Sequence, residues 1–119
     1  MNSIEAVETY CRAFGAEVTV EIKNGAKTAY EHCELSVNGE GILAVAEAPK
    51  PYDVDLIHRL KLQTMTFNAF ELGSAEAVKN ALGVLSDGGV IIEDIHELPW
   101  SKCCATVIDR YGVCWWISI

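Results

Sequence analysis

The sequence predicts an α+β fold of two tandem βαβββ-type modules, the first of which lacks its first strand. Three observations favour this fold. The pentapeptide Ser3–Val7 (SIEAV) recurs as Ser74–Val78 (SAEAV), an offset of 71 residues from Ser3 to Ser74. Each copy opens a stretch of helical periodicity that ends in glycine, and three strand-like segments follow each stretch. Because neither half can cover its own apolar face, we expect curved sheets around a shared cleft, with the helices on the outside.

The first half begins with a predicted helix over Ser3–Phe14, where apolar side chains recur at helical spacing. Asn2 or Ser3 can cap its free amides, and Gly15 suits a left-handed residue at its end. Two hairpin dipeptides, Asn24-Gly25 and Asn38-Gly39, separate the strands that follow. These strands are predicted at Glu17–Lys23, Thr28–Val37 and Gly41–Glu47.

Two prolines in Ala48–Asp53 forbid regular strand pairing and mark the boundary between the halves. The whole chain is then a single domain, with module 1 over about 1–48, a linker at 49–53 and module 2 over about 54–119. The segment 54–62 has no clear pattern, and either it or a second molecule could fill the edge left by the missing strand.

The second half repeats the order of the first, with an additional strand in front of its helix. That strand is predicted at Gln63–Leu72, and the helix begins after a capping Ser74 and ends at Asp87-Gly88-Gly89. The helix should bury Val78, Ala81, Leu82 and Leu85. The closing strands are predicted at Val90–Glu97, Lys102–Asp109 and Val113–Ile119.

Composition excludes several classes of function. The formal net charge is −8, and no basic stripe is present, which argues against binding nucleic acid or an anionic membrane. No apolar stretch approaches the roughly 18 residues of a membrane span, and the N-terminus does not resemble a signal peptide. We therefore expect a cytoplasmic protein.

Five cysteines, an odd number without a CxxC pair, indicate reduced thiols rather than a disulfide framework. They can be small buried side chains, or one of them, at Cys103-Cys104 or Cys114, can be a reactive thiol near the cleft. Adjacent cysteines in a strand point to opposite faces, so at most one of Cys103 and Cys104 can line a pocket.

Three stretches resemble the PhnB-like branch of the vicinal-oxygen-chelate superfamily, which includes glyoxalase I, bleomycin resistance proteins and dihydroxybiphenyl dioxygenase. The first is Glu5–Glu17, which ends in Phe-Gly-Ala-Glu, and the second is the His-bearing strand Tyr30–Leu35 with Asn38-Gly39. The third is Trp100 followed by Val107–Ile117, which contains an Asp-x-Tyr-Gly motif and a tryptophan pair. The resemblance implies the two-module fold, and it implies a homodimer because relatives pair their modules across subunits.

The resemblance also implies where metal ligands would lie. Metal-dependent relatives use His or Glu on the first and last strand of each module to hold a divalent ion. Here the first of these strands is absent, and the other positions fall near Leu43 or Ala44, near Phe67 and at Trp116. None of these side chains can coordinate a metal, so we expect no metal, no cofactor and no glyoxalase or dioxygenase activity.

His32 and Glu34 are the candidate catalytic residues. Strand alternation puts Tyr30, His32, Glu34 and Ser36 on one face and the apolar residues between them on the other. His32 could act as a general base oriented by Glu34, or it could be a hydrogen-bonded structural histidine. His58 and His96 have no spacing with other ligands and are interpreted as surface residues, and Glu93 is a weaker candidate for the cleft.

Candidate ligand-binding residues are mostly aromatic. Phe67, Cys114 and Trp116 can line an apolar cavity suited to a planar molecule, or they can fill it. Trp115 and Ile117 take the opposite face and belong to the core. The ligand-binding set is Tyr30, Phe67, Trp100, Cys114 and Trp116.

Three functions remain open at this point. The first is a metal-free protein that binds a small apolar or aromatic molecule in the cleft between the modules. The second is a small-molecule enzyme of lyase or isomerase type that uses His32 as acid or base. The third is a structural or interaction dimer with a closed cavity, which the vacant sheet edge and the loop residue Trp100 favour.

Overall fold

The computed structural model describes residues 2–47, 66–69 and 72–119, and its elements follow the predicted order. The segment 54–62, the linker, His58 and part of the predicted strand 63–72 lie outside these residues. The elements are α1 (Ser3–Phe14), β1 (Glu17–Lys23), β2 (Tyr30–Val37), β3 (Glu40–Val45), β4 (Thr66–Ala69), α3 (Ala75–Leu85), β5 (Val90–Leu98), β6 (Ser101–Ile108) and β7 (Cys114–Ser118).

The strands form one sheet in each half of the chain. The first sheet has the order β1-β2-β3 and is antiparallel throughout. The second has the order β4-β7-β6-β5, with β4 parallel to β7. Among the described residues the second half has the order β-α-β-β-β and the first half the order α-β-β-β, which confirms the predicted α+β fold class.

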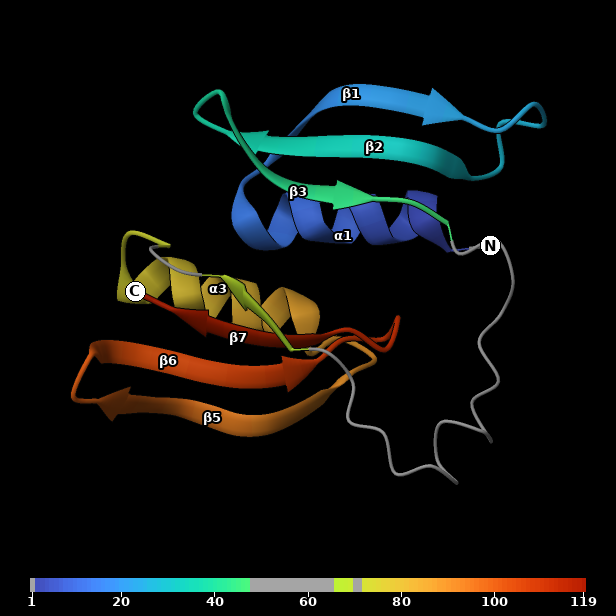
Figure 1. Cartoon of the computed structure of the whole chain (residues 1–119). Helices are drawn as coiled ribbons and strands as arrows, with labels where there is room; N and C mark the ends of the chain where they lie inside the picture. The colour runs from blue at the N-terminus through green and yellow to red at the C-terminus, as the bar shows by residue number, and fades with distance from the viewer. Residues whose placement is uncertain (1, 48–65, 70–71) are drawn as a thin grey trace.

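Helices α1 and α3 lie side by side and run in opposite directions, and in the view of Figure 1 α1 overlaps the strand β3 while α3 overlaps β4 and β7. The smallest extent of the molecule is 21 Å. That thickness holds one layer of helices against one layer of sheet, since each layer is about 10 Å deep. The exposed residues Glu5, Glu8 and Arg12 form a stripe on α1 that faces solvent, on the side of this helix away from the core.

A single core lies between the two layers. Helix α3 buries the four residues predicted from its periodicity, and α1 contributes Ala6, Val7, Tyr10 and Ala13. The sheets contribute Cys33, Leu35, Cys103, Ala105, Val107, Trp115 and Ile117. Both halves share this cluster, so neither half buries its apolar surface alone.

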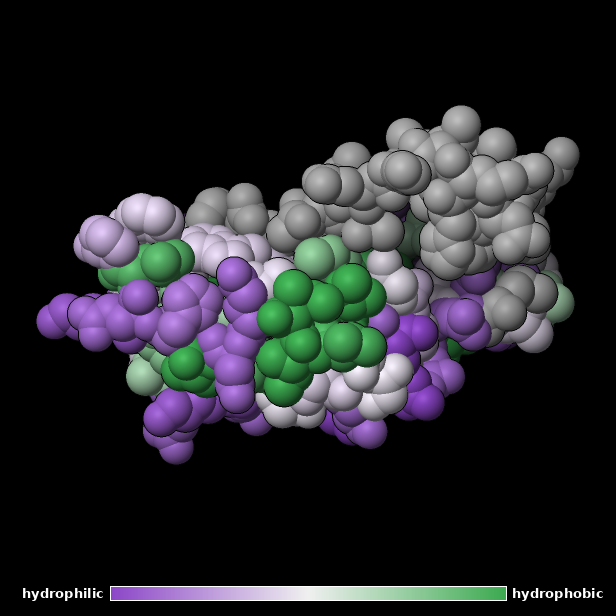
Figure 2. All heavy atoms as spheres, turned by 90° about the horizontal axis from the view of Figure 1, so that it is seen from below, coloured by the Kyte–Doolittle hydropathy of each residue, from purple (hydrophilic) through white to green (hydrophobic). Residues whose placement is uncertain are grey.

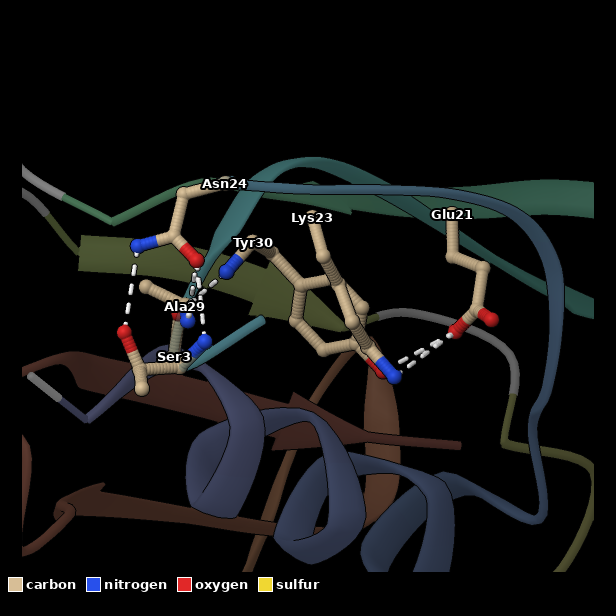
Figure 3. A network of polar contacts seen from close by, with 7 residues as sticks. Ser3, Glu21, Lys23, Asn24, Ala29 and Tyr30 are labelled. Atoms are coloured by element: carbon tan, nitrogen blue, oxygen red, sulfur yellow. Dashed lines mark hydrogen bonds and ion pairs between the residues drawn. The ribbon is translucent and has the colours of Figure 1, made fainter. Parts of the chain in front are cut away.

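The two helices are capped in different ways. Ser74 caps α3 as predicted, because its Oγ accepts a hydrogen bond from Ala77 N at 3.1 Å. The prediction that Asn2 or Ser3 caps α1 is wrong. The carboxylate of Glu47 accepts from the backbone amides of Asn2 and Ser3 at 2.9 and 2.7 Å, while Ser3 Oγ accepts from Tyr30 N (Figure 3).

The asparagines of the two predicted turns in the first half of the chain help to form these turns. Asn38 and Gly39 both have positive φ, 50° and 80°, as a tight hairpin of this dipeptide requires. At the other turn the side chain of Asn24 accepts from the backbone amides of Thr28 and Ala29 (Figure 3).

Among the described residues, neither helix is long and apolar enough to cross a bilayer.

The two modules are joined through the buried carboxylate of Asp109, which is 3% exposed and follows β6. Its Oδ2 accepts from Tyr10 Oη at 2.8 Å and from Trp115 Nε1 at 2.9 Å. Its Oδ1 accepts from the backbone amides of Tyr111 and Val113 at 2.9 and 3.0 Å. Burial, together with the hydrogen bond to Asp109, raises the pKa of Tyr10, so this phenol remains a donor at neutral pH.

Replacement of Asp109 by Ala should destabilise the fold by roughly 3 kcal/mol or more, because four buried or partly buried donors lose their acceptor. Asp109→Asn should cost less, since one oxygen can still serve the two amides. Urea unfolding measures both variants, with the exposed Asp87→Ala as the control. Equal stabilities of the Asp109→Ala and Asp87→Ala proteins would refute the role of this carboxylate.

Glu47 gives α1 an acid-sensitive cap. Burial alone would raise the pKa of Glu47, but its hydrogen bonds from Ser3 and Asn2 outweigh burial and lower it. A lowered native pKa means that the stabilisation is complete above the unfolded value of about 4.3 and is lost as the pH falls through the native pKa.

Glu47→Gln should therefore lose about 1 kcal/mol at pH 7, and this deficit should shrink below about pH 4. The exposed Glu40→Gln removes the same charge from β3 and serves as the control. Thermal unfolding across pH 3–7 gives the comparison; a deficit that does not change with pH would contradict the assignment.

Candidate functional site

The candidate site lies on the sheet surfaces opposite the two described helices, α1 and α3, which we call the helix-free faces. Residues in register across a sheet project to the same side. In the first sheet Glu34 is in register with Val20 and Ala44, opposite the buried Cys33 and Leu35. In the second sheet Thr106 is in register with Glu93 and Trp116, opposite the buried Val107 and Trp115.

His32 and Glu34 lie on the helix-free face, as strand alternation predicted. The structure also brings them into direct contact, with His32 Nε2 at 2.8 Å from Glu34 Oε1. Both side chains are more than 40% exposed, so the pair is open to solvent and to a ligand. A carboxylate against one ring nitrogen orients the imidazole, which leaves its other nitrogen available for proton transfer or a hydrogen bond.

Tyr30 does not share this face, and the prediction from simple alternation is wrong at this position. Ile22 pairs with His32, but the next residue, Lys23, pairs with Tyr30, so Glu31 is an extra residue in β2. Such a bulge turns the side chains beyond it to the other face. Tyr30 is therefore buried in the core, where burial raises its pKa.

The surroundings of Tyr30 confirm that it is a packing residue (Figure 3). Its hydroxyl donates to Glu21 Oε2 at 3.3 Å, and Lys23 Nζ lies 5.4 Å from the centre of its ring. Lys23 Nζ is also 3.6 Å from Glu21 Oε2. These contacts connect the edge strand β1 to β2, and the backbone amide of Tyr30 donates to Ser3 Oγ at the beginning of α1.

The aromatic candidates are distributed over several places. Trp116 lies on the helix-free face and is partly buried, whereas Trp115 and Ile117 are in the core, as predicted. Cys114 is in register with Ile108 and is 8% exposed. Phe67 is in register with Trp115 rather than with Trp116. Trp100 is 71% exposed in the turn between β5 and β6.

Two polar pairs on the second sheet escaped the sequence analysis. Thr106 Oγ1 donates to Glu93 Oε2 at 3.0 Å, and Cys104 Sγ lies 3.4 Å from His96 Nε2. His96 is partly exposed, in keeping with its interpretation as a surface residue, but it has a partner that the sequence did not indicate. The pairing between β5 and β6 shifts register three times, so the residue opposite His96 could not be found by counting along the sequence.

The cysteines are free, and all but Cys11 are buried. Cys103 belongs to the core cluster while Cys104 is in register with Ser118 on the helix-free side, as the alternation of adjacent residues predicted. Burial, with smaller contributions from Cys103 and Glu93, raises the pKa of Cys104. Its thiol is therefore neutral near pH 7 and needs a base to react.

The helix-free faces lack the donors of a metal centre where the resemblance would place them. Ala44 lies on this face, Leu43 packs against the core, and Trp116 has no side-chain atom that binds a divalent ion. Within residues 2–47, 66–69 and 72–119, no group of three or more His, Cys, Asp or Glu side chains could hold a metal ion. The residues present do not fit a glyoxalase-type metal.

The fold is similar to that of several solved structures. Protein PA1353 from Pseudomonas aeruginosa is 18% identical with a TM-score of 0.71, over 96% of this chain and 86% of that one. The PhnB protein from Bacillus cereus is 16% identical with a TM-score of 0.68, over 98% and 90%. TioX from Micromonospora sp. ML1 is 21% identical with a TM-score of 0.63, over 96% and 84%.

No protein-family model matches the sequence, and no curated protein matches it either. At identities of 16–21%, the structural similarity shows the fold, which this chain shares with a PhnB protein. It does not transfer a ligand or a reaction.

Proposed function

We propose that this chain is a PhnB-like member of the vicinal-oxygen-chelate superfamily that binds a small apolar or aromatic molecule without a metal. The ligand would contact the helix-free faces of the two sheets. The single observation that carries this proposal is the composition of the face around His32 and Glu34. An exposed polar pair lies there beside exposed apolar residues, on strand faces that point away from the described helices α1 and α3.

The apolar part of the face is substantial. Ile22 is in register with His32 and is 52% exposed, and Val20 is in register with Glu34 and is 39% exposed. On the second sheet, Trp116 offers an aromatic ring beside Thr106 and Glu93. Apolar surface with a few polar groups is the usual lining of a small-molecule site, and an aromatic ring favours stacking of a planar ligand.

The edge strand β1 provides a matched test of which face binds. Val18 and Val20 are the same residue type with equal exposure, 40% and 39%, but a bulge at Thr19 puts them on opposite faces. Val20→Ser should weaken binding by about 1 kcal/mol, roughly fivefold in Kd, whereas Val18→Ser should leave Kd unchanged.

The ligand for this comparison comes from a thermal-shift screen of apolar and aromatic compounds, and Kd is measured by tryptophan quenching. Equal effects of the two substitutions would place binding elsewhere. A broad screen without any stabilising compound would contradict the proposed function as a whole.

A second candidate is an enzyme that uses His32 as general acid or base, and the 2.8 Å contact between His32 and Glu34 favours it. If it is correct, His32→Ala should reduce turnover of a substrate found by screening by about a hundredfold or more. Glu34→Gln should reduce it less, because only the orientation of the ring is lost. The control is His96→Ala, and turnover that survives His32→Ala would eliminate this candidate.

A third candidate is an interaction module whose dimer is its product. Strand β5 is the lower edge of the molecule in Figure 1, and Figure 2, seen from below, shows an apolar patch there. Val90, Ile91 and Ile92 of this strand are 60%, 43% and 54% exposed. Consecutive exposed apolar residues on a strand at the edge of the described sheet are typical of a surface that binds another chain.

We expect a homodimer for the binding protein as well as for the interaction module. Light scattering across protein concentrations should give twice the mass of one chain, and Ile92→Lys should shift the equilibrium towards the monomer. A monomer at every concentration would remove the third candidate.

A further inference from the structure

His96 and Cys104 form a nucleophile and base pair that the proposed function does not use. They face each other across β5 and β6, with Cys104 Sγ 3.4 Å from His96 Nε2. The pair lies in the second module, whereas His32 and Glu34 belong to the first. The strands β2 and β6 occupy equivalent places in the repeat. His32 and Cys104 are 72 residues apart, and so are Glu34 and Thr106.

The orientation of the histidine ring determines which nitrogen can act as base. His96 Nδ1 lies 2.8 Å from the backbone carbonyl oxygen of Asp94. A carbonyl oxygen only accepts hydrogen bonds, so Nδ1 must carry the proton in this contact. In the neutral ring Nε2 then has a free lone pair at 3.4 Å from Cys104 Sγ, and the backbone carbonyl oxygen of His96 is a second acceptor at 3.4 Å from the same sulfur. A nucleophile, a base and a group that orients the base are the three parts of an activated thiol.

The surroundings restrict what can reach this thiol. Cys104 has no exposed surface, while His96, which contacts its sulfur, is partly exposed. A buried sulfur excludes bulky electrophiles, which need an open approach. A small neutral oxidant can enter after a minor movement of a side chain, so burial selects for the smallest reagents.

We infer that Cys104 and His96 form an oxidation site that reacts with a small hydroperoxide. In the reaction His96 Nε2 takes the thiol proton while the sulfur attacks one peroxide oxygen. The O–O bond breaks, and the leaving hydroxide takes the proton from Nε2 to become water. With hydrogen peroxide, the thiol and the peroxide give a sulfenic acid and water, so sulfur is oxidised and the peroxide is reduced.

Cys103 provides a control within the same protein. It is the next residue along β6 and is 3% exposed, but it belongs to the apolar core cluster on the opposite face of the strand. A site that depends on the base should oxidise Cys104 and spare Cys103. Simple leakage of oxidant into the interior should not distinguish them.

The test uses the full chain and hydrogen peroxide as the probe. Native protein is exposed to peroxide, catalase stops the reaction, and the chain is unfolded in dimedone so that every sulfenic acid is labelled. Peptide mass spectrometry should show label at Cys104 at least about tenfold above Cys103, and His96→Gln should remove most of that excess. Circular dichroism and the label at Cys33, which is fully buried in the core, report whether the variant is folded.

Equal labelling of Cys103 and Cys104 in the wild-type protein would overturn the inference. So would an unchanged excess at Cys104 in a folded His96→Gln variant. If the His96→Gln variant unfolds, the ratio of the dimedone label at Cys104 to that at Cys103 in the wild-type protein decides whether the inference holds. The inference is independent of ligand binding at His32 and Glu34, because Val20→Ser should leave the labelling of Cys104 unchanged.

Discussion

The buried carboxylate of Asp109 is the contact on which the arrangement of the two modules depends. It accepts a hydrogen bond from Tyr10 on the first helix and another from Trp115 on the last strand. The rings of Tyr10 and Trp115 meet edge to face at 5.2 Å, and Phe14 packs against the same indole at 5.1 Å. A carboxylate buried with four donors is costly to separate from them, so α1 is held against the second sheet.

With the helices held on one side, the other side of each sheet is left for function. A second cross-module contact supports the same arrangement, because Asn80 on α3 donates to the carbonyl oxygen of Arg12 at the end of α1. The two described helices are therefore joined to each other, and the opposite face of each strand points away from them. The helix-free faces of the two sheets have the same arrangement of strands, but they carry side chains of different chemistry. Ala44 of the first sheet corresponds to Trp116 of the second, and Val20 corresponds to Glu93.

Residues that carried the resemblance have structural roles here. Tyr10, Asp109 and Trp115 belong to motifs in the first helix and the closing segment, and the structure brings them into one buried network. Such a network accounts for these motifs without any reaction, since each residue satisfies a buried polar group. The chemistry must be sought on residues outside it, such as His32, Glu34, His96 and Cys104.

Local patterns along the chain were enough to predict the two described helices, α1 and α3, and the glycine and asparagine turns. Amphipathic periodicity and the residues of turns act over a few neighbouring positions, so these elements can be predicted from the sequence. The face of Tyr30, the Glu47 cap on α1 and the contact of His96 with Cys104 depended on the tertiary structure. Each results from a bulge, a register shift or a partner more than forty residues away, and only the packing of the sheets decides these.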